Sequence, residues 1–139
     1  MDAQTILPFN TQWDTGATCR LGKTFTDVDN SLFAGVTGNL SPLHMDEHHC
    51  RARGLDGRLL FEALIAGLAS ASAAELTGGK YTVGKMSMEI FSLPMLGATY
   101  HAEATMGRKD EGFCEVSVQV TDPESGGRVA TVEFQYKRL

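Results

Sequence analysis

The sequence predicts an α+β fold in which an antiparallel sheet covers one long central helix. Two observations predict it. A long apolar segment with a helical period lies in the middle of the chain, and the part after residue 80 alternates like strands separated by turn sequences. Helices followed by a run of consecutive strands are typical of the α+β class. The 139 residues suffice for a single domain, 1–139, with a hydrophobic core.

Composition argues against several classes of function. The net charge is −5 and the pI is near 5.3, which disfavours nucleic acid as a partner because phosphates require a basic surface. No apolar run approaches the roughly 20 residues of a membrane span, and the N-terminus shows no secretory signal, so no membrane partner is expected. The three cysteines lack a CxxC spacing, which favours reduced thiols and a cytoplasmic location.

The first part of the chain contains an arm, a strand and a short helix. Residues 1–17 show no period and are expected to form an irregular arm, which Phe9 and Trp13 hold against the domain. A strand is expected at Thr18–Thr24. Thr26 then has the character of a helix N-cap, with acidic residues in the first turn, and Gly38 ends that helix. One apolar stripe follows the helical period: Val28, Leu32, Phe33 and Val36.

The connector after this helix carries a histidine. Pro42 forces Ser41 out of the helical region, so His44 is expected on a stiff connector, and Asp46 is expected to cap another short helix. Histidine exchanges a proton near neutral pH with little tuning. His48 lies four residues beyond His44, but the proline and the cap interrupt a shared helix face, so we expect no metal site.

The segment Leu59–Thr77 is the longest expected helix, and it ends at two glycines. Because it is apolar on most sides, we expect it to be buried. One face is expected to consist of Leu60, Leu64, Leu68 and Ala71, with the small residues Ala63, Gly67 and Ala74 nearby.

A four-stranded meander is expected to follow this helix. Its turns carry Pro94, Gly97, the Asp110–Gly112 stretch and the Asp122–Gly127 stretch. Alternation in the third segment is expected to place one face inward. The expected strands are Tyr81–Phe91, Ala98–Arg108, Phe113–Thr121 and Arg128–Tyr136, and the alternating apolar residues of the third are Cys114, Val116, Val118 and Val120.

Several of these segments resemble the hydratase motif of the MaoC-like family, which includes R-specific enoyl-CoA hydratases and related acyl-thioester dehydratases. The resemblance rests on Phe25 to Asp29, Phe33-Ala34, Thr37-Gly38 and Pro42 to Asp46, and on Phe91, Pro94 and Gly97 further on. It implies the hotdog fold, in which a curled antiparallel sheet wraps around a central helix. It also implies an acyl-CoA or acyl-carrier-protein thioester as substrate, no cofactor, and a homodimer or higher homo-oligomer.

The chain departs from the family where the catalytic residues lie. The family aspartate falls on Asn39, which cannot take a proton, and the family asparagine falls on Ser41. The His-Gly pair before the central helix falls on Phe61 and Glu62, so His44 alone remains of the core catalytic residues. Losing the carboxylate should cost the usual hydration on the order of 10²–10⁴-fold.

Glu62 is therefore the most informative substitution. Near the start of the central helix its charge suits the helix dipole, and it is either a replacement for the lost acid or a helix-terminal glutamate. We expect hydratase or dehydratase activity with His44, Asn39 and Glu62 as catalytic residues and Ser41, Phe61 and Ala63 as substrate-binding residues. The alternatives are a hotdog thioesterase that uses Glu62, and an inactive thioester-binding or partner subunit.

Overall fold

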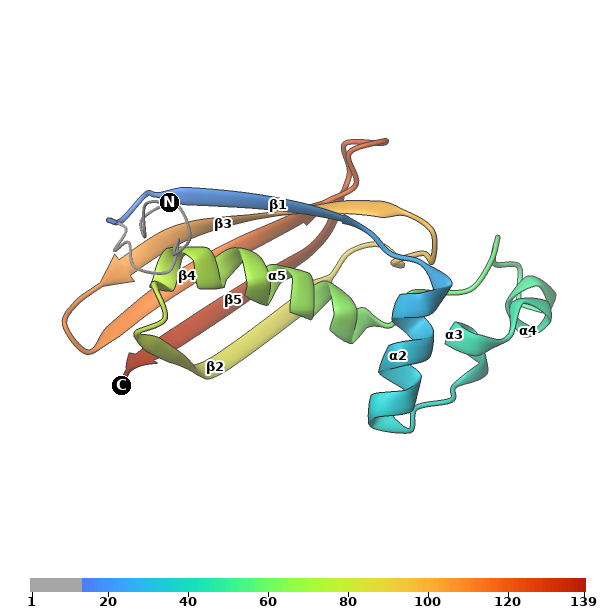
Figure 1. The fold of residues 1–139 in the computed structure, drawn as a ribbon. Helices are drawn as coiled ribbons and strands as arrows, with labels where there is room; N and C mark the ends of the chain where they lie inside the picture. The colour runs from blue at the N-terminus through green and yellow to red at the C-terminus, as the bar shows by residue number, and fades with distance from the viewer. Residues whose placement is uncertain (1–13) are drawn as a thin grey trace, which may run out of the picture.

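The computed structural model describes residues 14–139, which form a five-stranded antiparallel sheet with one long helix across it (Figure 1). The expected arm falls largely on residues 1–13, so Phe9 and Trp13 lie outside the described residues. In chain order the elements are β1 (Thr18–Thr24), α2 (Asp27–Thr37), α3 (Pro42–Met45), α4 (Glu47–Ala52), α5 (Glu62–Thr77), β2 (Tyr81–Ile90), β3 (Thr99–Lys109), β4 (Phe113–Thr121) and β5 (Arg128–Arg138).

The strand order in the sheet is β1-β3-β4-β5-β2, so the predicted four-stranded meander is wrong in one respect. β2 pairs with β5 at one edge, and only β3, β4 and β5 follow one another as neighbours. The segment 91–98 must carry the chain across about 14 Å, three strand spacings of roughly 4.8 Å. A segment of this length can span that distance, since an extended chain covers roughly 3.3 Å per residue. Turn residues alone did not distinguish this crossing from a hairpin.

Helix α5 packs on one face of the sheet and contacts β1, β3, β4 and β5 (Figure 1). The expected alternation of β4 is confirmed, because its four inward residues are fully buried. Each buried valine stabilises the fold by roughly 1.5–3 kcal/mol relative to an exposed one. The hydroxyl of Ser72, which is fully buried, lies 2.8 Å from the carbonyl of Cys19 and 3.1 Å from that of Ala102. The sheet-facing residues of α5 are Ile65, Leu68, Ala69, Ser72, Ala73 and Leu76.

The long helix begins three residues later than predicted. Leu59 forms an isolated bridge with Met95, and the N–H of Leu60 donates to the carbonyl of Pro94 at 2.9 Å. Residues 59–61 are extended because these contacts with another segment satisfy their backbone groups, and Phe61 is the N-cap of α5. Leu60 is fully buried, but it is not part of the helix face on which it was predicted.

The sheet covers only one side of α5. The expected burial of this helix is confirmed on the sheet side, since eight of its 16 residues are buried, whereas Ala63, Gly67 and Ala71 are exposed along the other side. These residues are small, and a face of small residues allows close approach of another backbone. Among the described residues, no helix is long and apolar enough to cross a membrane.

Helix α2 has the predicted ends. The N–H of Thr26 donates to the carboxylate of Asp29 at 2.8 Å, which is half of a capping box, and this bond holds the pKa of Asp29 below its usual value. Gly38 follows with a φ of 76°. The predicted apolar stripe is largely exposed, at 64–85% for Val28, Leu32 and Val36. The buried face of α2 consists of Asn30 and Ala34 instead.

Two of the three cysteines are packing residues. Cys50 and Cys114 are fully buried, and all three thiols in the described chain are free. Burial raises the pKa of Cys114 and of Cys19, and the charge of Glu75 raises that of Cys19 further. A thiol with a raised pKa is a poor nucleophile because its reactive thiolate form is scarce.

Candidate active site

His44 lies in a single helical turn that the sequence did not predict. Pro42 is the first residue of α3, where the missing N–H costs nothing, and Asp46 caps α4 by accepting the N–H of His49 at 3.0 Å. The predicted cap at Asp46 is thereby confirmed. His44 is only 7% exposed, so neighbouring residues and not solvent surround most of its ring.

The contacts of the imidazole define its protonation pattern. Nδ1 of His44 lies 3.0 Å from the carbonyl oxygen of Leu59. A carbonyl oxygen only accepts, so Nδ1 carries a hydrogen, and in the neutral ring Nε2 is left as an acceptor. That Nε2 lies 3.6 Å from Oε2 of Glu62.

Glu62 is the first residue of α5, and its side chain is 52% exposed. A carboxylate at this position lies next to the positive end of the helix dipole. A carboxylate and a neutral Nε2 are both acceptors, and a separation of 3.6 Å exceeds a good hydrogen bond. The pair therefore offers two converging acceptor atoms at the surface end of a buried histidine, which suits a bound water that donates to both.

Phe61 fills the space behind this pair. It is 1% exposed, its ring stacks on His44 with centroids 4.1 Å apart, and it contacts Phe33 at 4.6 Å. The three rings come from α2, α3 and the N-cap of α5. The ring of Phe61 thereby covers one face of the imidazole.

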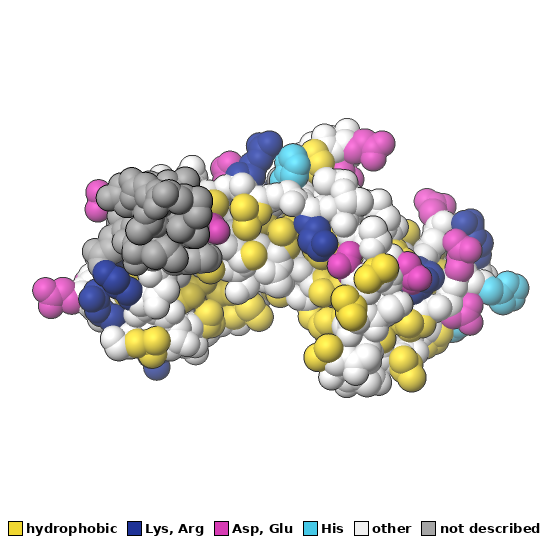
Figure 2. Space-filling model, in the orientation of Figure 1, with side chains coloured by type: hydrophobic (Ala, Val, Ile, Leu, Met, Phe, Trp, Pro, Cys, Tyr) yellow, Lys and Arg dark blue, Asp and Glu magenta, His cyan; other side chains and the backbone are white. Residues whose placement is uncertain are grey.

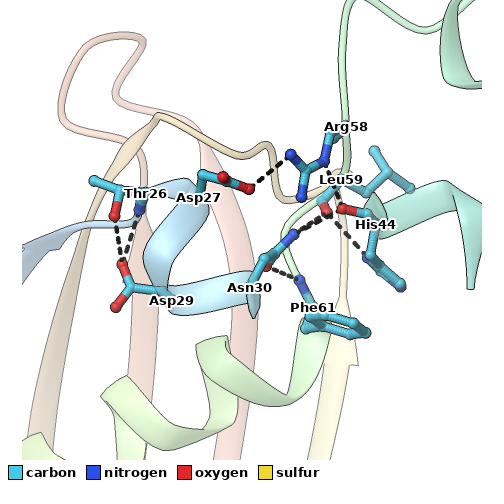
Figure 3. A network of polar contacts seen from close by, with 8 residues as sticks. All are labelled: Thr26, Asp27, Asp29, Asn30, His44, Arg58, Leu59 and Phe61. Carbon is cyan, nitrogen blue, oxygen red and sulfur yellow. Dashed lines mark hydrogen bonds and ion pairs between the residues drawn. The ribbon is translucent and has the colours of Figure 1, made fainter. Parts of the chain in front are cut away.

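A polar network joins these elements on the other side of His44 (Figure 3). The amide of Asn30 donates to the carbonyls of His44 and Leu59, both at 3.1 Å, and its oxygen accepts the N–H of Phe61 at 3.2 Å. Nε of Arg58 donates to the carbonyl of His44 at 2.7 Å. Its Nη1 forms an ion pair with Asp27, also at 2.7 Å.

Sequence reasoning missed Asn30 and Arg58. The sequence does contain an indication for Asn30. Asn30 lies three and four residues before Phe33 and Ala34, so the three residues share one helix face. Asparagine is a poor helix former, so its presence on an apolar face marks a buried polar contact. The same pattern gives no signal for Arg58, which lies in the irregular segment just before Leu59.

The remaining predicted site residues lie nearby in sequence but differ in exposure. The side chain of Asn39 is exposed, and its Oδ1 accepts the N–H of Ser41 at 3.1 Å. Within the described part of the chain, no hydrogen bond joins Asn39 to His44 or to Glu62. Ala63 is exposed on the first turn of α5, directly after Glu62.

Two concave surfaces flank the site. An apolar groove of about 270 Å³ runs between α2 and the first turn of α5, and a second, more polar concavity of about 510 Å³ lies beside the carbonyl side of His44. Figure 2 shows the hydrophobic side chains that gather over α2. The groove is lined by Asp29, Leu32, Phe33, Val36 and Leu64, and the polar concavity by Glu47, Asp56, Gly57, Arg58, Met95 and Leu96.

Comparisons with known proteins agree with this architecture. A family model described as a MaoC like domain matches residues 9–127. Among solved structures, the unliganded R-hydratase PhaJ1 from Pseudomonas aeruginosa matches with a TM-score of 0.83 and 19% identity, over 95% of this chain and 85% of that one. An (R)-hydratase from A. caviae involved in PHA biosynthesis matches with a TM-score of 0.80 and 20% identity, over 91% and 98% of the two chains.

A third similar structure is a complex, the ChsH1-ChsH2 complex from Mycobacterium tuberculosis. It matches with a TM-score of 0.80 and 14% identity, over 91% of this chain and 98% of that one. At these identities the likeness establishes the fold alone. A search of curated proteins gave no significant match.

Proposed function

The chain belongs to the MaoC-like dehydratase domain family and has its hotdog fold, and on this premise we propose that it adds or removes water at a 2-enoyl thioester of CoA or of a carrier protein. The observation that carries the proposal is the approach of Nε2 of His44 to Oε2 of Glu62, 3.6 Å apart at the start of α5. Glu62 thus stands in for the aspartate that this chain replaces with Asn39.

The pair supplies what hydration requires. A water that donates one hydrogen to Nε2 of His44 and one to Oε2 of Glu62 presents its oxygen lone pair to Cβ of the enoyl thioester. As the oxygen bonds to Cβ, Glu62 takes one proton and the electron pair of the double bond moves to the thioester as an enolate. The protonated pair then gives a proton to Cα, which restores the starting state and completes addition on one face.

Donors for the enolate oxygen are available at the same place. The N–H groups of Glu62 and Ala63 belong to the first turn of α5, whose N–H groups have no acceptor within a helix. Neighbouring N–H groups do have partners: Asn30 accepts that of Phe61, and the carbonyl of Phe61 accepts that of Leu64. Two N–H groups aimed at a developing oxyanion, next to the helix dipole, lower the barrier by an electrostatic effect.

Substrate contacts complete the proposal. Asn39 and Ser41, on the connector before His44, hold the thioester by hydrogen bonds, and the apolar groove beside Leu64 receives the acyl chain. Phe61 forms the inner wall. Two of the similar structures are R-hydratases, which supports hydration over other reactions of thioesters.

A paired assay tests the proposal. Purified protein is given crotonyl-CoA and, separately, a saturated acyl-CoA, while absorbance of the conjugated thioester and release of free thiol are both followed. We expect loss of absorbance without thiol, reduced on the order of 10²–10⁴-fold by Glu62→Gln and by His44→Ala. Glu75→Gln is the matched control, since it removes a carboxylate about 20 Å further along the same helix.

The other outcomes assign the protein differently. Thiol release that depends on Glu62 identifies a thioesterase, in which the same pair activates water against the thioester carbonyl. Absence of both reactions, together with a rise in melting temperature when an acyl-CoA is added, identifies a binding or partner subunit. Either result contradicts the hydratase proposal.

We also propose that the chain is at least a homodimer that associates through the exposed side of α5. Ala63, Gly67 and Ala71 are exposed there and are small enough to let a second helix approach closely. The exposed apolar stripe of α2 lies next to this side, across the groove that Leu64 lines. Exposed apolar surfaces of this kind mark interaction sites in soluble proteins.

A further inference from the structure

We propose that Asn30 is a positioning residue that sets the orientation of His44 relative to Glu62. Only the expected effect on activity rests on the proposed function. The contacts of Asn30 with the segments of His44 and of the start of α5 are the same whatever reaction these residues serve. Asn30 is fully buried and lies on α2, on a different element from either residue (Figure 3).

All three hydrogen-bonding positions that the amide of Asn30 uses are directed at the backbone of the site. Its two N–H groups donate to the carbonyls of His44 and Leu59, and its oxygen accepts the N–H of Phe61, the residue before Glu62. One side chain therefore joins the backbone of the histidine to the backbone that starts the helix of the glutamate. In the sequence these two segments are separated by α4 and its following turn, and in space the N–H of Leu59 also donates to the carbonyl of Leu43 at 2.9 Å.

The carbonyl of Leu59 couples this network to the imidazole. It accepts from Nδ2 of Asn30 at 3.1 Å and also from Nδ1 of His44 at 3.0 Å. Because Asn30 helps to orient this carbonyl, it acts on the bond that keeps the hydrogen on Nδ1 and leaves Nε2 as an acceptor on the side of Glu62. The histidine tautomer is thus set through a shared acceptor rather than by direct contact.

A second anchor from the same helix strengthens the arrangement. Arg58 donates to the carbonyl of His44 and pairs with Asp27, which lies three residues before Asn30 on α2. The carbonyl of His44 is therefore held by two donors, both tied to the first turns of α2. Helix α2 acts as a fixed support for the turn that carries the histidine.

The chemistry of the amide explains why asparagine is required. Aspartate has the same shape but no donors when ionised, so it would place an acceptor against two carbonyls. Leucine is of similar volume but leaves the carbonyls and the N–H of Phe61 without their buried partner. Both substitutions remove the donors to the carbonyls of His44 and Leu59. Only the aspartate also adds a negative charge.

The test uses Asn30→Asp and Asn30→Leu beside Ser72→Ala. Ser72 is also fully buried and bonded to backbone carbonyls, but it lies on the far side of α5 from the site, facing β1 and β3. Nitrogen-15 NMR of the imidazole, with His44→Ala to assign the signal, reports the tautomer without any assay of activity. We expect one Nδ1–H tautomer in the wild type and in Ser72→Ala, and a mixture of tautomers in both Asn30 variants.

Activity gives the second readout. If the protein hydrates enoyl thioesters, we expect the Asn30 variants to lower kcat about 10–100-fold with little change in KM, as displaced catalytic groups do. Ser72→Ala should leave kcat per folded molecule unchanged. An unaltered tautomer and an unaltered kcat in Asn30→Leu, with stability lost as in Ser72→Ala, would overturn the inference and leave Asn30 as a packing residue.

The wild-type protein provides a test that needs no variant to fold. We expect the side-chain amide protons of Asn30 to exchange with solvent as slowly as the backbone N–H of Phe61, because they share one buried network. Exchange at the rate of a surface asparagine would refute the inference. A protein without hydratase activity but with the expected tautomer and exchange would contradict the proposed function and leave the role of Asn30 standing.

Discussion

The imidazole of His44 stacks on the ring of Phe61, with centroids 4.1 Å apart and an angle of 25° between the planes. Phe61 directly precedes Glu62, so the residue that supports the histidine is also the N-cap of the helix that carries the carboxylate. The separation of the two candidate catalytic groups therefore depends on a packed aromatic side chain as well as on hydrogen bonds.

The first prediction concerns this aromatic support. Replacing Phe61 by alanine should reduce the free energy of unfolding by about 3–5 kcal/mol, and by leucine about 1–1.5 kcal/mol, because the buried ring leaves a cavity of different size. Urea unfolding followed by circular dichroism measures both. Phe91→Leu is the control at an exposed ring, with an expected loss below about 0.5 kcal/mol. Equal losses at Phe61 and Phe91 would contradict the burial of the Phe61 ring.

The second prediction concerns Asp29. The N–H of Thr26 and then the charge of Lys23 hold the pKa of Asp29 in the folded chain below that of the unfolded chain. A lowered folded pKa stabilises the protein above the unfolded value, near 4, and this contribution disappears as the pH falls through the folded pKa. Asp29→Asn should thus cost about 0.5–1 kcal/mol at pH 7, and less as the pH falls below about 4. The urea midpoints of the wild type and of Asp29→Asn, measured from pH 7 to pH 3, check this prediction. A difference between them that stays constant over this range would contradict it.

The third prediction compares two glycines at the end of α2. A Cβ added at Gly35 or at Gly38 meets nothing within 4 Å, but only Gly38 has a positive φ, of 76°. Gly35→Ala should stabilise the protein by about 0.5–1 kcal/mol, whereas Gly38→Ala should destabilise it by about 1–2 kcal/mol through backbone strain. Thermal unfolding of the two variants gives the sign of each effect. If both substitutions changed the stability in the same direction, the left-handed conformation at Gly38 would not be required.

The fourth prediction tests the proposed homodimer. Light scattering at micromolar concentration should give at least twice the mass of the chain. Ala71→Glu, on the exposed side of α5, should reduce that mass to one chain, because it buries a charge in the contact. Gln119→Glu adds the same charge on the exposed face of β4 and should have no effect. A monomeric wild type would refute the dimer.

Local patterns determined much of the fold. Alternation in Phe113–Thr121 predicted the strand and its buried face because side chains in a strand point in turn to opposite sides, whatever the strand pairs with. The caps at Thr26 and Asp46 and the turn at Gly38 were also predictable, since each depends on bonds or dihedral angles within a few residues. The motif around His44 indicated the family for the same reason.

Only the tertiary structure decided the features that depend on contacts between segments distant in the sequence. β2 lies beside β5 instead of β3, and residues 59–61 are extended because their backbone bonds to the segment near Met95 and Pro94. Local propensity contains no information about either partner.

The site shows the same division. The sequence singled out His44 and Glu62 as chemical groups, but only the folded chain brings Nε2 and Oε2 to 3.6 Å and buries Asn30 between the two backbone segments. A helical asparagine has no defined partner until the carbonyls of His44 and Leu59 lie against it. Residue types therefore determined which chemistry is available, and packing between distant elements decided which groups meet.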